Sequence, residues 1–337
     1  MLVEHYGFRE PPFLMTPDAR LFFASQGHSR AYAHLVYGIA QREGFIVVTG
    51  EVGAGKTTLI ERLCSELSPG AFVVSRIETS QVPGDDLLRL VARGFGAESQ
   101  GSKADVLHAI AETLRGAGGE AGRRHLLIVD EAQALTPAAL EELRMLSNVT
   151  DGHRALLQTL LIGQPQLRRL IASPDLDQLR QRVLASYHLS GLSQEETRAY
   201  VEYRLNAVGW TGHPSWEDGA LDRVHELTEG IPRRINRLCS RVLLSAALEN
   251  APVLTTAMVE ATARELEEDL GAGLRPGEAP APLPAAAETV PSAELRRLTA
   301  SIEDLGMRVA ALEQSGRQRE RVFALLNDLL LEIGRQR

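Results

Sequence analysis

Short apolar runs alternate with amphipathic helical patterns over the first half of the chain. The runs have the length of buried strands, and the segments between them repeat apolar residues at helical spacing. Strands that alternate with helices predict an α/β fold with a parallel sheet, because parallel neighbours need a crossover connection. We expect strands at 45–49, 71–77, 126–130 and 156–162, helices at 28–43, 56–67, 84–94, 103–115 and 137–148, and a flexible loop at 116–122.

The strand signals stop at about residue 193, and the pattern beyond it is helical. The sequence therefore predicts an α/β core over residues 1–192 and a small all-helical domain over residues 193–270. We expect the helices of this second domain at 195–208, 219–229, 232–249 and 255–270.

A stretch rich in proline and alanine, residues 271–291, follows the helical domain and is expected to be an extended, mobile linker. Residues 292–337 then place apolar residues in alternating steps of three and four, which is the repeat of a coiled coil. A coiled coil would serve self-association or partner binding, whereas a single amphipathic helix would dock back on its own domain. The repeat contains Leu295, Leu298, Ile302, Leu305, Val309 and Leu312, and continues in phase through Gly316, Arg319, Phe323, Leu326, Leu330 and Ile333.

The first apolar run ends in a glycine-rich loop from Gly50 to Thr58, with the sequence GEVGAGKTT. This loop matches G-x-x-x-x-G-K-[ST], a pattern in which backbone N–H groups surround a phosphate. Glycines permit the backbone angles that such a loop needs, and the helix that follows points its positive end at the anion. The alternative is a chance glycine-rich turn, which the flanking strand and helix argue against.

The residues of this loop have expected roles toward ATP and Mg²⁺. The Lys56 ammonium would bridge the β- and γ-phosphates, and the Thr57 hydroxyl would hold Mg²⁺. Lys56 and Lys103 are the only lysines among 36 basic residues, so a compact, flexible ammonium is present where arginine is the rule elsewhere. The residues expected around the phosphates are Gly53, Ala54, Gly55, Lys56, Thr57 and Thr58.

Two adjacent carboxylates, Asp130 and Glu131, follow the apolar run at 126–129. Carboxylates at the end of a buried strand are costly unless they face a cation. We therefore expect Asp130 to hold the magnesium through water and Glu131 to orient and polarise the attacking water. The alternative is an ordinary turn in which both residues cap the next helix. Together with the phosphate loop, the pair predicts an ATPase.

Residues 1–30 are rich in phenylalanine, proline and tyrosine. Pro11, Pro12 and Pro17 exclude a long helix there, because proline lacks the N–H that a helix interior needs. The segment either packs across the nucleotide base or forms an apolar clasp on the core, and the sequence supports both equally.

Bulk properties narrow the functional class. A net charge of −8 argues against a surface that binds nucleic acid throughout, although a local basic stripe is compatible with it. Cys64 and Cys239 lie in apolar helical patterns and are expected to be buried thiols in a reducing compartment. We find neither a secretory signal nor an apolar run long enough to span a membrane, so we expect a cytoplasmic location.

Several stretches resemble the general secretion pathway protein A class of AAA+ ATPases, over residues 1–270. Within that class, the chain is most similar to the branch found with exosortase and exopolysaccharide gene clusters. The resemblance implies a P-loop NTPase core of the AAA+ type with a helical lid, followed here by the coiled-coil tail. The stretches are YGF and PF within residues 6–13, GFIVVTGEVGAGKTT, VDEAQ, LIGQPQL and GIPRRIN.

The resemblance implies roles for residues outside the two nucleotide motifs. Gln164 falls at the sensor-1 position, where a polar side chain responds to the γ-phosphate. Arg233 falls at the sensor-2 position, from which the lid places an arginine on the nucleotide, and Arg234 would face the other way. The alternative for each of these arginines is an ordinary surface residue in an arginine-rich chain.

The resemblance also places an arginine finger in the run from Leu179 to Val183, before the last core strand. In AAA+ proteins such an arginine reaches the neighbouring subunit. Arg182 is the first choice and Arg180 the second. A finger that acts in trans requires a homo-oligomer, either a ring or a filament, because the active site is then shared.

Three functions remain compatible with these features. The first is an AAA+ motor or switch that couples ATP turnover to a secretion, exopolysaccharide export or envelope assembly system. It would dock a protein partner through the tail and lie in the cytoplasm or, through that partner, at the inner membrane. The second is a DNA-associated ATPase similar to transposition regulators or origin-recognition proteins, which the acidic balance and the lack of a winged-helix pattern disfavour. The third is a nucleotide-gated scaffold that hydrolyses slowly.

Overall fold

The structure is a computed structural model that describes residues 2–14, 22–78, 84–119 and 123–269. The expected linker and coiled-coil tail lie outside these described residues. A five-stranded sheet forms the centre of the first domain, with the strand order β2-β3-β6-β1-β7 and every neighbouring pair parallel. This confirms the predicted parallel α/β fold. The strands are β1 (Phe45–Gly50), β2 (Phe72–Glu78), β3 (Arg124–Asp130), β6 (Leu157–Gly163) and β7 (Val183–Leu189).

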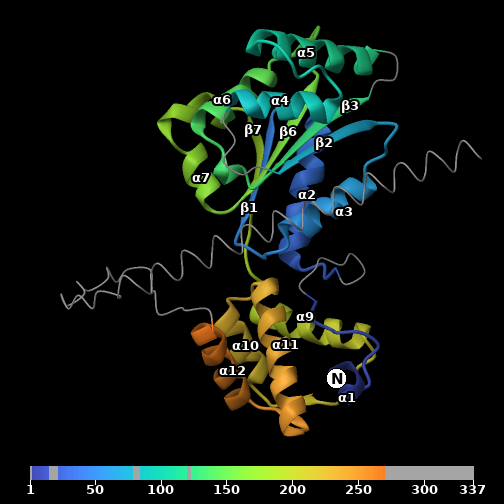
Figure 1. The fold of residues 1–337 in the computed structure, drawn as a ribbon, viewed down its shortest axis with the longest axis vertical. Coiled ribbons are helices and arrows are strands. Elements are labelled where there is room, and N and C mark those ends of the chain that lie inside the picture. The colour runs from blue at the N-terminus through green and yellow to red at the C-terminus, as the bar shows by residue number, and fades with distance from the viewer. Residues whose placement is uncertain (1, 15–21, 79–83, 120–122, 270–337) are drawn as a thin grey trace, which may run out of the picture. The chain divides into compact units, whose positions relative to one another are not determined.

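Helices cover both faces of this sheet, so the strands are apolar on both sides (Figure 1). Phe45 and Val47 of β1 pack in one apolar cluster, whereas Ile46 and Val48 pack in the other, because successive side chains of a strand point to opposite faces. One cluster contains residues of α2 (Gln26–Gln41) and α3 (Lys56–Glu66), and the other contains residues of α4 (Gly84–Phe95), α5 (Lys103–Gly119), α6 (Pro137–Leu146), α7 (Gln166–Ile171) and α8 (Asp177–Arg180).

Two features of the core differ from the sequence prediction. Residues 116–119, expected in a loop, continue helix α5, whose preceding turns are anchored by the buried Ile110 and Leu114. Each glycine costs a helix only about 1 kcal/mol, which tertiary packing readily outweighs. The structure also contains a short hairpin of β4 (Thr150–Asp151) and β5 (Arg154–Ala155), whose strands are too short to show an alternating pattern.

The second domain is helical, as predicted, and it comprises α9 (Gln194–Ala207), α10 (Ala220–Thr228), α11 (Pro232–Glu249) and α12 (Thr256–Asp269). The expectation that strands are absent beyond residue 193 is wrong. Two-residue strands, β8 (Ser215–Trp216) and β9 (Val253–Leu254), pair in parallel within this domain. They are too short for periodicity to reveal them.

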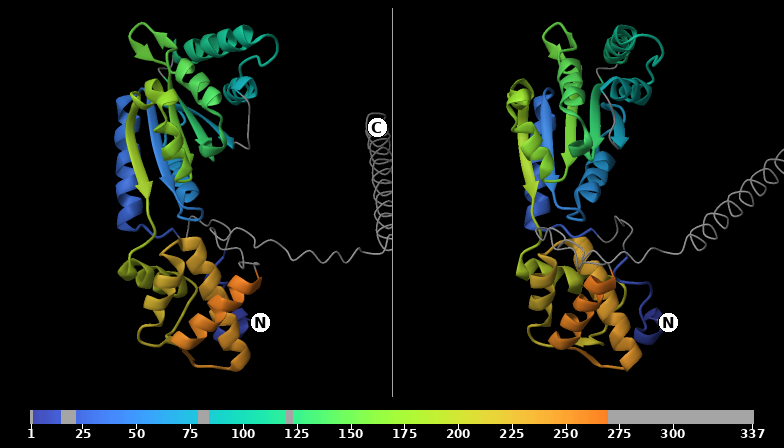
Figure 2. Two further views of the ribbon diagram at one scale, coloured as in Figure 1. Left: turned by 90° about the vertical axis from the view of Figure 1, so that its left-hand side faces the viewer. Right: turned by 60° about the vertical axis from the view of Figure 1, so that its left-hand side comes forward.

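The N-terminal segment packs with the helical lid, which corrects the predicted domain boundary of 1–192. It begins with the short helix α1 (Leu2–Tyr6), which lies beside the lid helices (Figure 2). Tyr6, Phe8 and Phe13 are buried in the same apolar cluster as α9, α10 and α11, and the Tyr6 hydroxyl donates a hydrogen bond to the Leu243 carbonyl at 3.1 Å. These three large aromatic side chains thereby extend the apolar core of the lid.

The two cysteines differ in burial. Cys239 is fully buried in the lid, as expected, and burial raises the pKa of its thiol. Cys64 of α3 is only partly buried, because it lies beside the apolar cluster and not at its centre, which corrects the second half of the prediction. Among the helices within residues 2–14, 22–78, 84–119 and 123–269, none combines the length and apolar composition needed to cross a membrane.

Candidate functional site

Three neighbouring strands end at one edge of the sheet and bring the predicted site residues together. β6 lies between β1 and β3, so the glycine-rich loop, the Asp130–Glu131 pair and Gln164 follow adjacent strand ends. A cavity of about 370 Å³ opens there, a size typical of small-molecule sites. Its lining includes Gly53, Gly55, Lys56, Thr57, Thr58 and Glu131, whereas Ala54 is buried beneath the loop.

The glycine-rich loop has a backbone that only glycine allows at two positions. Gly53 and Gly55 have φ of +85° and +96°, in the left-handed region. A Cβ on Gly55 would also come within 2.5 Å of the ring nitrogen Nε2 of His28. His28, a buried residue of α2 that the sequence analysis did not single out, therefore packs directly on the loop.

Lys56 is a buried cation at the glycine-rich loop of this cavity. Its ammonium donates hydrogen bonds to the carbonyls of Gly50 at 2.7 Å and Glu51 at 2.9 Å. Burial lowers the pKa of Lys56, and the nearby charges of Glu131 and Asp130 act in the opposite direction. The lysine is thus poised for an anionic ligand, because an anion would stabilise a charge that burial disfavours.

Glu131 is held in place by two side-chain amides. Its carboxylate accepts hydrogen bonds from Gln133 Nε2 at 2.5 Å and from Gln164 Nε2 at 3.0 Å. Burial on its own would raise the pKa of Glu131, but the two amide donors and the Lys56 charge outweigh burial, so the pKa is lowered. The expected catalytic base and the expected sensor are therefore in direct contact.

Gln133 connects these groups, although no motif in the sequence assigns it a role. While its amide nitrogen donates to Glu131, its Oε1 accepts a hydrogen bond from the backbone N–H of Gln164 at 2.9 Å. One side chain thereby joins the ends of β3 and β6. The available signal was the stretch VDEAQ, in which only the two carboxylates were given functions.

Asp130 is not among the residues that line the cavity. It is 6% exposed, and both of its carboxylate oxygens accept hydrogen bonds. Oδ2 accepts a hydrogen bond from Arg76 of the neighbouring strand β2 at 2.7 Å, and Oδ1 accepts one from the Glu131 N–H at 3.0 Å. The carboxylate of Asp130 and the hydroxyl of Thr57 are hard oxygen donors. This small donor set fits Mg²⁺ held mainly by phosphate oxygens and water.

The two neighbouring lid arginines have different surroundings, and the sensor role of Arg233 stays a prediction. Arg233, at the start of α11, lines the cavity, and its backbone N–H donates to the Gly53 carbonyl at 3.3 Å. A Cβ on Gly53 would lie 2.3 Å from the Cβ of Arg233, so the loop and the lid helix touch without room for a side chain. Arg234 instead forms an ion pair with Glu229 at 2.7 Å.

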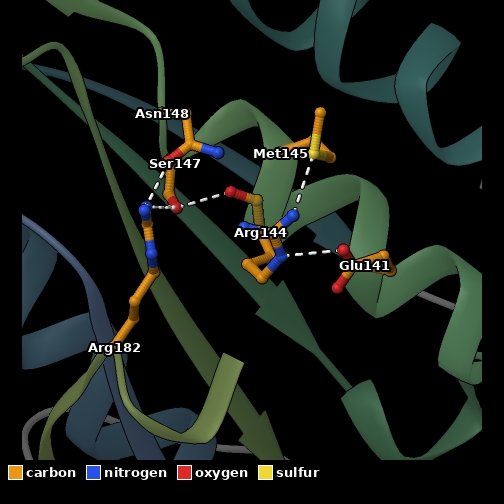
Figure 3. Close-up of polar contacts among 6 residues, drawn as sticks. All are labelled: Glu141, Arg144, Met145, Ser147, Asn148 and Arg182. Atoms are coloured by element: carbon orange, nitrogen blue, oxygen red, sulfur yellow. Dashed lines mark hydrogen bonds and ion pairs between the residues drawn. The ribbon is translucent and has the colours of Figure 1, made fainter. Parts of the chain in front are cut away.

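The two candidate arginine fingers form bonds within their own chain, away from this cavity. Arg182 precedes β7 and donates hydrogen bonds to Ser147 Oγ at 2.7 Å and to Asn148 Oδ1, at the C-terminal end of α6 (Figure 3). Arg180 forms an ion pair with Asp177 at 2.8 Å. Neither lines the cavity of its own chain, and an action in trans stays a prediction.

Aromatic side chains of the N-terminal segment fall into two groups, one at the cavity and one on the lid. Phe22 and Phe23 line the cavity, whereas Tyr6, Phe8 and Phe13 form a clasp, but on the lid. The apolar clasp therefore forms on the lid and not on the core, and packing across a nucleotide base stays a prediction for Phe22 and Phe23.

The lid contributes polar groups to the cavity. Arg204 and Asn236 line it, and both donate hydrogen bonds to the Leu14 carbonyl, at 3.3 Å and 3.2 Å. Arg204 is only 4% exposed, and its Nε has no hydrogen-bond partner. Arg204 could not be predicted as a site residue, because a single arginine within an amphipathic helix gives no local signal in the sequence.

A phosphate-binding loop, an acidic strand end and a helical lid on one parallel sheet define a P-loop protein of the AAA+ class. A family model described as an AAA domain matches residues 39–171. The general secretion pathway protein A of Aeromonas hydrophila is 39% identical over 249 residues, which are 73% of this chain and 45% of that protein. The chain therefore belongs to the general secretion pathway protein A type of AAA+ protein, and it spans under half the length of this relative.

Solved structures share the fold at low sequence identity. The ORC2 protein of Aeropyrum pernix is 18% identical, with a TM-score of 0.52 over 71% of this chain and 67% of that one. Cdc6p of Pyrobaculum aerophilum is 16% identical, with a TM-score of 0.56 over 77% of this chain and 75% of that one. At these identities the likeness concerns the fold alone.

Proposed function

We propose that this chain binds ATP with Mg²⁺ and hydrolyses it, and that it acts as a motor or switch. The observation that carries the proposal is that Lys56 and Glu131 line one cavity, while Gln164 donates a hydrogen bond to the Glu131 carboxylate from the end of the strand between them. A cation for the phosphates, a base for water and a polar sensor are the parts that phosphoryl transfer to water needs.

The chain's own groups would act as follows. The backbone N–H groups of residues 53–58 and the Lys56 ammonium bind the phosphates, for which Lys56 exchanges its two carbonyl partners for phosphate oxygens. Glu131 orients the attacking water and accepts its proton, and its lowered pKa keeps it ionised at neutral pH. Thr57 and Asp130 would hold Mg²⁺, which neutralises charge on the phosphates.

The biological process is inferred from the relative. Its name assigns it to the general secretion pathway, and we propose that this chain serves a secretion or exopolysaccharide export system. The predicted coiled coil at 292–337 would dock a protein partner, which would bring a cytoplasmic protein to the inner membrane. Arg182, or in its place Arg180, would reach the site of a neighbouring copy in a homo-oligomer.

The chain's two lysines offer a matched test of this proposal. Lys56→Ala should abolish ATP binding in a titration of the full chain, because the phosphates lose their buried cation. Lys103→Ala, which removes an exposed lysine paired with Glu142 on the other side of the core, should leave the ATP affinity unchanged. Equal ATP affinities for wild type and Lys56→Ala would refute the assignment of the loop.

Turnover of Glu131→Gln separates an enzyme from a slow scaffold. We expect it to bind ATP normally and to hydrolyse it at least about a hundredfold more slowly, since the amide cannot accept the proton from water. Steady-state phosphate release measures this. A rate equal to that of the wild type would support a nucleotide-gated scaffold instead.

A further inference from the structure

Arg204 of α9 is a buried cation in the wall of the nucleotide cavity. It lines the cavity although the residue is only 4% exposed, and its Nε has no hydrogen-bond partner. Its Nη2 donates to the Leu14 carbonyl at 3.3 Å, which is long for an N–H···O bond. The protein itself therefore satisfies this guanidinium poorly, and such a group is costly to bury unless a ligand completes its hydrogen bonds.

A second polar group of this wall, the Asn236 amide of α11, is oriented by a neighbour. The Tyr200 hydroxyl donates to Asn236 Oδ1 at 2.8 Å, and Asn236 Nδ2 in turn donates to the Leu14 carbonyl at 3.2 Å. The Leu14 carbonyl thereby lies beside donors of both Arg204 and Asn236. All four residues line the cavity, so its wall offers donors and an acceptor side by side.

Aromatic rings next to these polar groups provide a surface for a flat ligand. Phe22 and Phe23 line the same cavity. Phe23 packs edge to face against Tyr200, with ring centroids 5.7 Å apart, and the Arg62 guanidinium of α3 lies 5.4 Å from the centroid of the Phe22 ring. Stacking on an aromatic ring is favourable for every base, because every base has a π-face. The rings therefore suit a nucleobase without selecting among bases, and the selection is left to the polar groups.

We propose that Arg204 determines the base specificity of this chain, by donating to a ring nitrogen of adenine while the Leu14 carbonyl accepts from the adenine amino group. The inference rests on the proposed binding of ATP. Arg204 would exchange its long bond to Leu14 for one to the ring nitrogen, which frees the carbonyl for the amino group. Adenine carries an amino donor beside a ring-nitrogen acceptor, whereas guanine carries the acceptor O6 in place of the amino group. Guanine would therefore set its O6 against the Leu14 carbonyl.

Diphosphates test the inference without turnover of the ligand. Calorimetry with the full chain and Mg²⁺ should show that ADP binds at least about tenfold more tightly than GDP, because guanine leaves polar groups of the wall unpaired. One of the two analogues 7-deaza-ADP and 1-deaza-ADP, each of which replaces one ring nitrogen by a C–H group, should bind at least about tenfold more weakly than ADP. The weaker analogue identifies the nitrogen that Arg204 contacts.

Arg204→Met should remove this discrimination, so that ADP and both deaza analogues bind with equal, weakened affinity. A purely structural arginine would instead weaken all three ligands alike and keep the ratios between them. Arg198→Met, which removes an exposed arginine of the same helix paired with Asp222, is the matched control and should keep the wild-type ratios. If Arg204→Met does not fold, Arg204→Gln, which keeps a polar group in the wall, should narrow the ratios in the same direction.

Several outcomes would overturn the inference. They are equal affinity of the wild type for ADP and GDP, equal affinity for ADP and both deaza analogues, or ratios that the Arg204 variants leave unchanged. ADP binding that Lys56→Ala abolishes but Arg204→Met leaves intact would overturn the inference alone, while the proposed function stands. Absence of ADP binding to the wild type would refute the proposed function, and the inference with it.

Discussion

The side-chain amide of Gln133 connects the residue that follows β3 to the residue that follows β6. The amide donates a hydrogen bond to the Glu131 carboxylate and accepts one from the backbone N–H of Gln164. A movement of either residue would therefore strain or break one of these two bonds. Glu131 has φ of +52°, an uncommon conformation for a residue with a side chain, and the amide contacts help to hold it there. Gln133 is a positioning residue, because it acts through Glu131 and does not line the cavity.

The pH profile of turnover should report this role. Gln133→Ala removes a donor that stabilises the charged carboxylate, so the pKa of Glu131 should rise and the acidic limb of kcat should move to higher pH. ATP affinity should stay within about twofold, since Gln133 makes no contact with the cavity. Gln166→Ala, at an exposed position of α7, is the control. An acidic limb that does not move would mean that Gln133 is only structural.

The sequence predicts those site residues that lie within one contiguous motif. Lys56, Thr57 and Glu131 lie within contiguous motifs, so their spacing along the chain also sets their spacing in the site. The partners of Asp130 and Arg204 could not be predicted. Arg76 reaches Asp130 across the β2–β3 register, and Arg204 reaches the cavity from the lid, and both contacts depend on long-range packing.

One carboxylate, that of Glu196, accepts hydrogen bonds from backbone N–H groups at the starts of two helices. Ser193 and Glu196 form a capping box at the N-terminus of α9, with the Ser193 hydroxyl accepting from the Glu196 N–H at 3.1 Å. Glu196 Oε1 also accepts from the backbone N–H of Gln26, at the start of α2, at 2.7 Å. The first lid helix and the first core helix therefore share a cap.

Removal of this cap should destabilise the chain measurably. Ser193→Ala leaves backbone N–H groups of α9 unsatisfied and should lower the free energy of unfolding by about 1 kcal/mol. Ser29→Ala, at an exposed position in the first turn of α2, should be neutral or slightly stabilising, because alanine favours a helix. Urea unfolding followed by circular dichroism compares the two. Equal midpoints would show that the cap contributes nothing.

Long helices and strands with a regular apolar pattern could be predicted from the sequence, whereas strands of two residues could not. The helix expected at 232–249 coincides with α11, and the strand expected at 126–130 lies within β3. The parallel pair of β8 and β9 has two residues in each strand, and only the packing of distant lid segments brings them together. Periodicity carries no information at that length.

Two buried histidines make the free energy of unfolding of the chain depend on pH. His28 lies against the phosphate loop and His125 lies in β3, and burial lowers the pKa of both from the ordinary value of 6.5. The unfolded chain therefore binds more protons than the folded chain once the pH falls below that value. Stability from these groups is present above pH 6.5 and is lost as the pH falls toward the folded pKa values.

We expect the melting temperature without nucleotide to fall between pH 7 and pH 5, and to fall less steeply in His28→Gln, which cannot titrate. His153→Gln, a change of an exposed histidine in the β4–β5 hairpin region, should follow the wild-type profile. Scanning calorimetry over that range provides the comparison. If His28→Gln and His153→Gln lose stability in parallel, the pH dependence belongs to other groups.

The N-terminal clasp shows where domain prediction from sequence fails. Position along the chain suggested that residues 2–14 belong to the core, yet their aromatic side chains are buried in the lid. Burial of Tyr6, Phe8 and Phe13 depends on which apolar face lies within reach, and a linear pattern does not encode that.

The contact between Gly53 and Arg233 has a mechanical consequence. α11 begins on the phosphate loop, backbone against backbone, and extends for 18 residues, about 27 Å at the rise of an α-helix. A rotation of a few degrees at its base becomes a shift of ångströms at its tip. If the glycine-rich loop binds phosphates as proposed, α11 would pivot at that loop, and a partner bound at its far end would be displaced when the nucleotide changes.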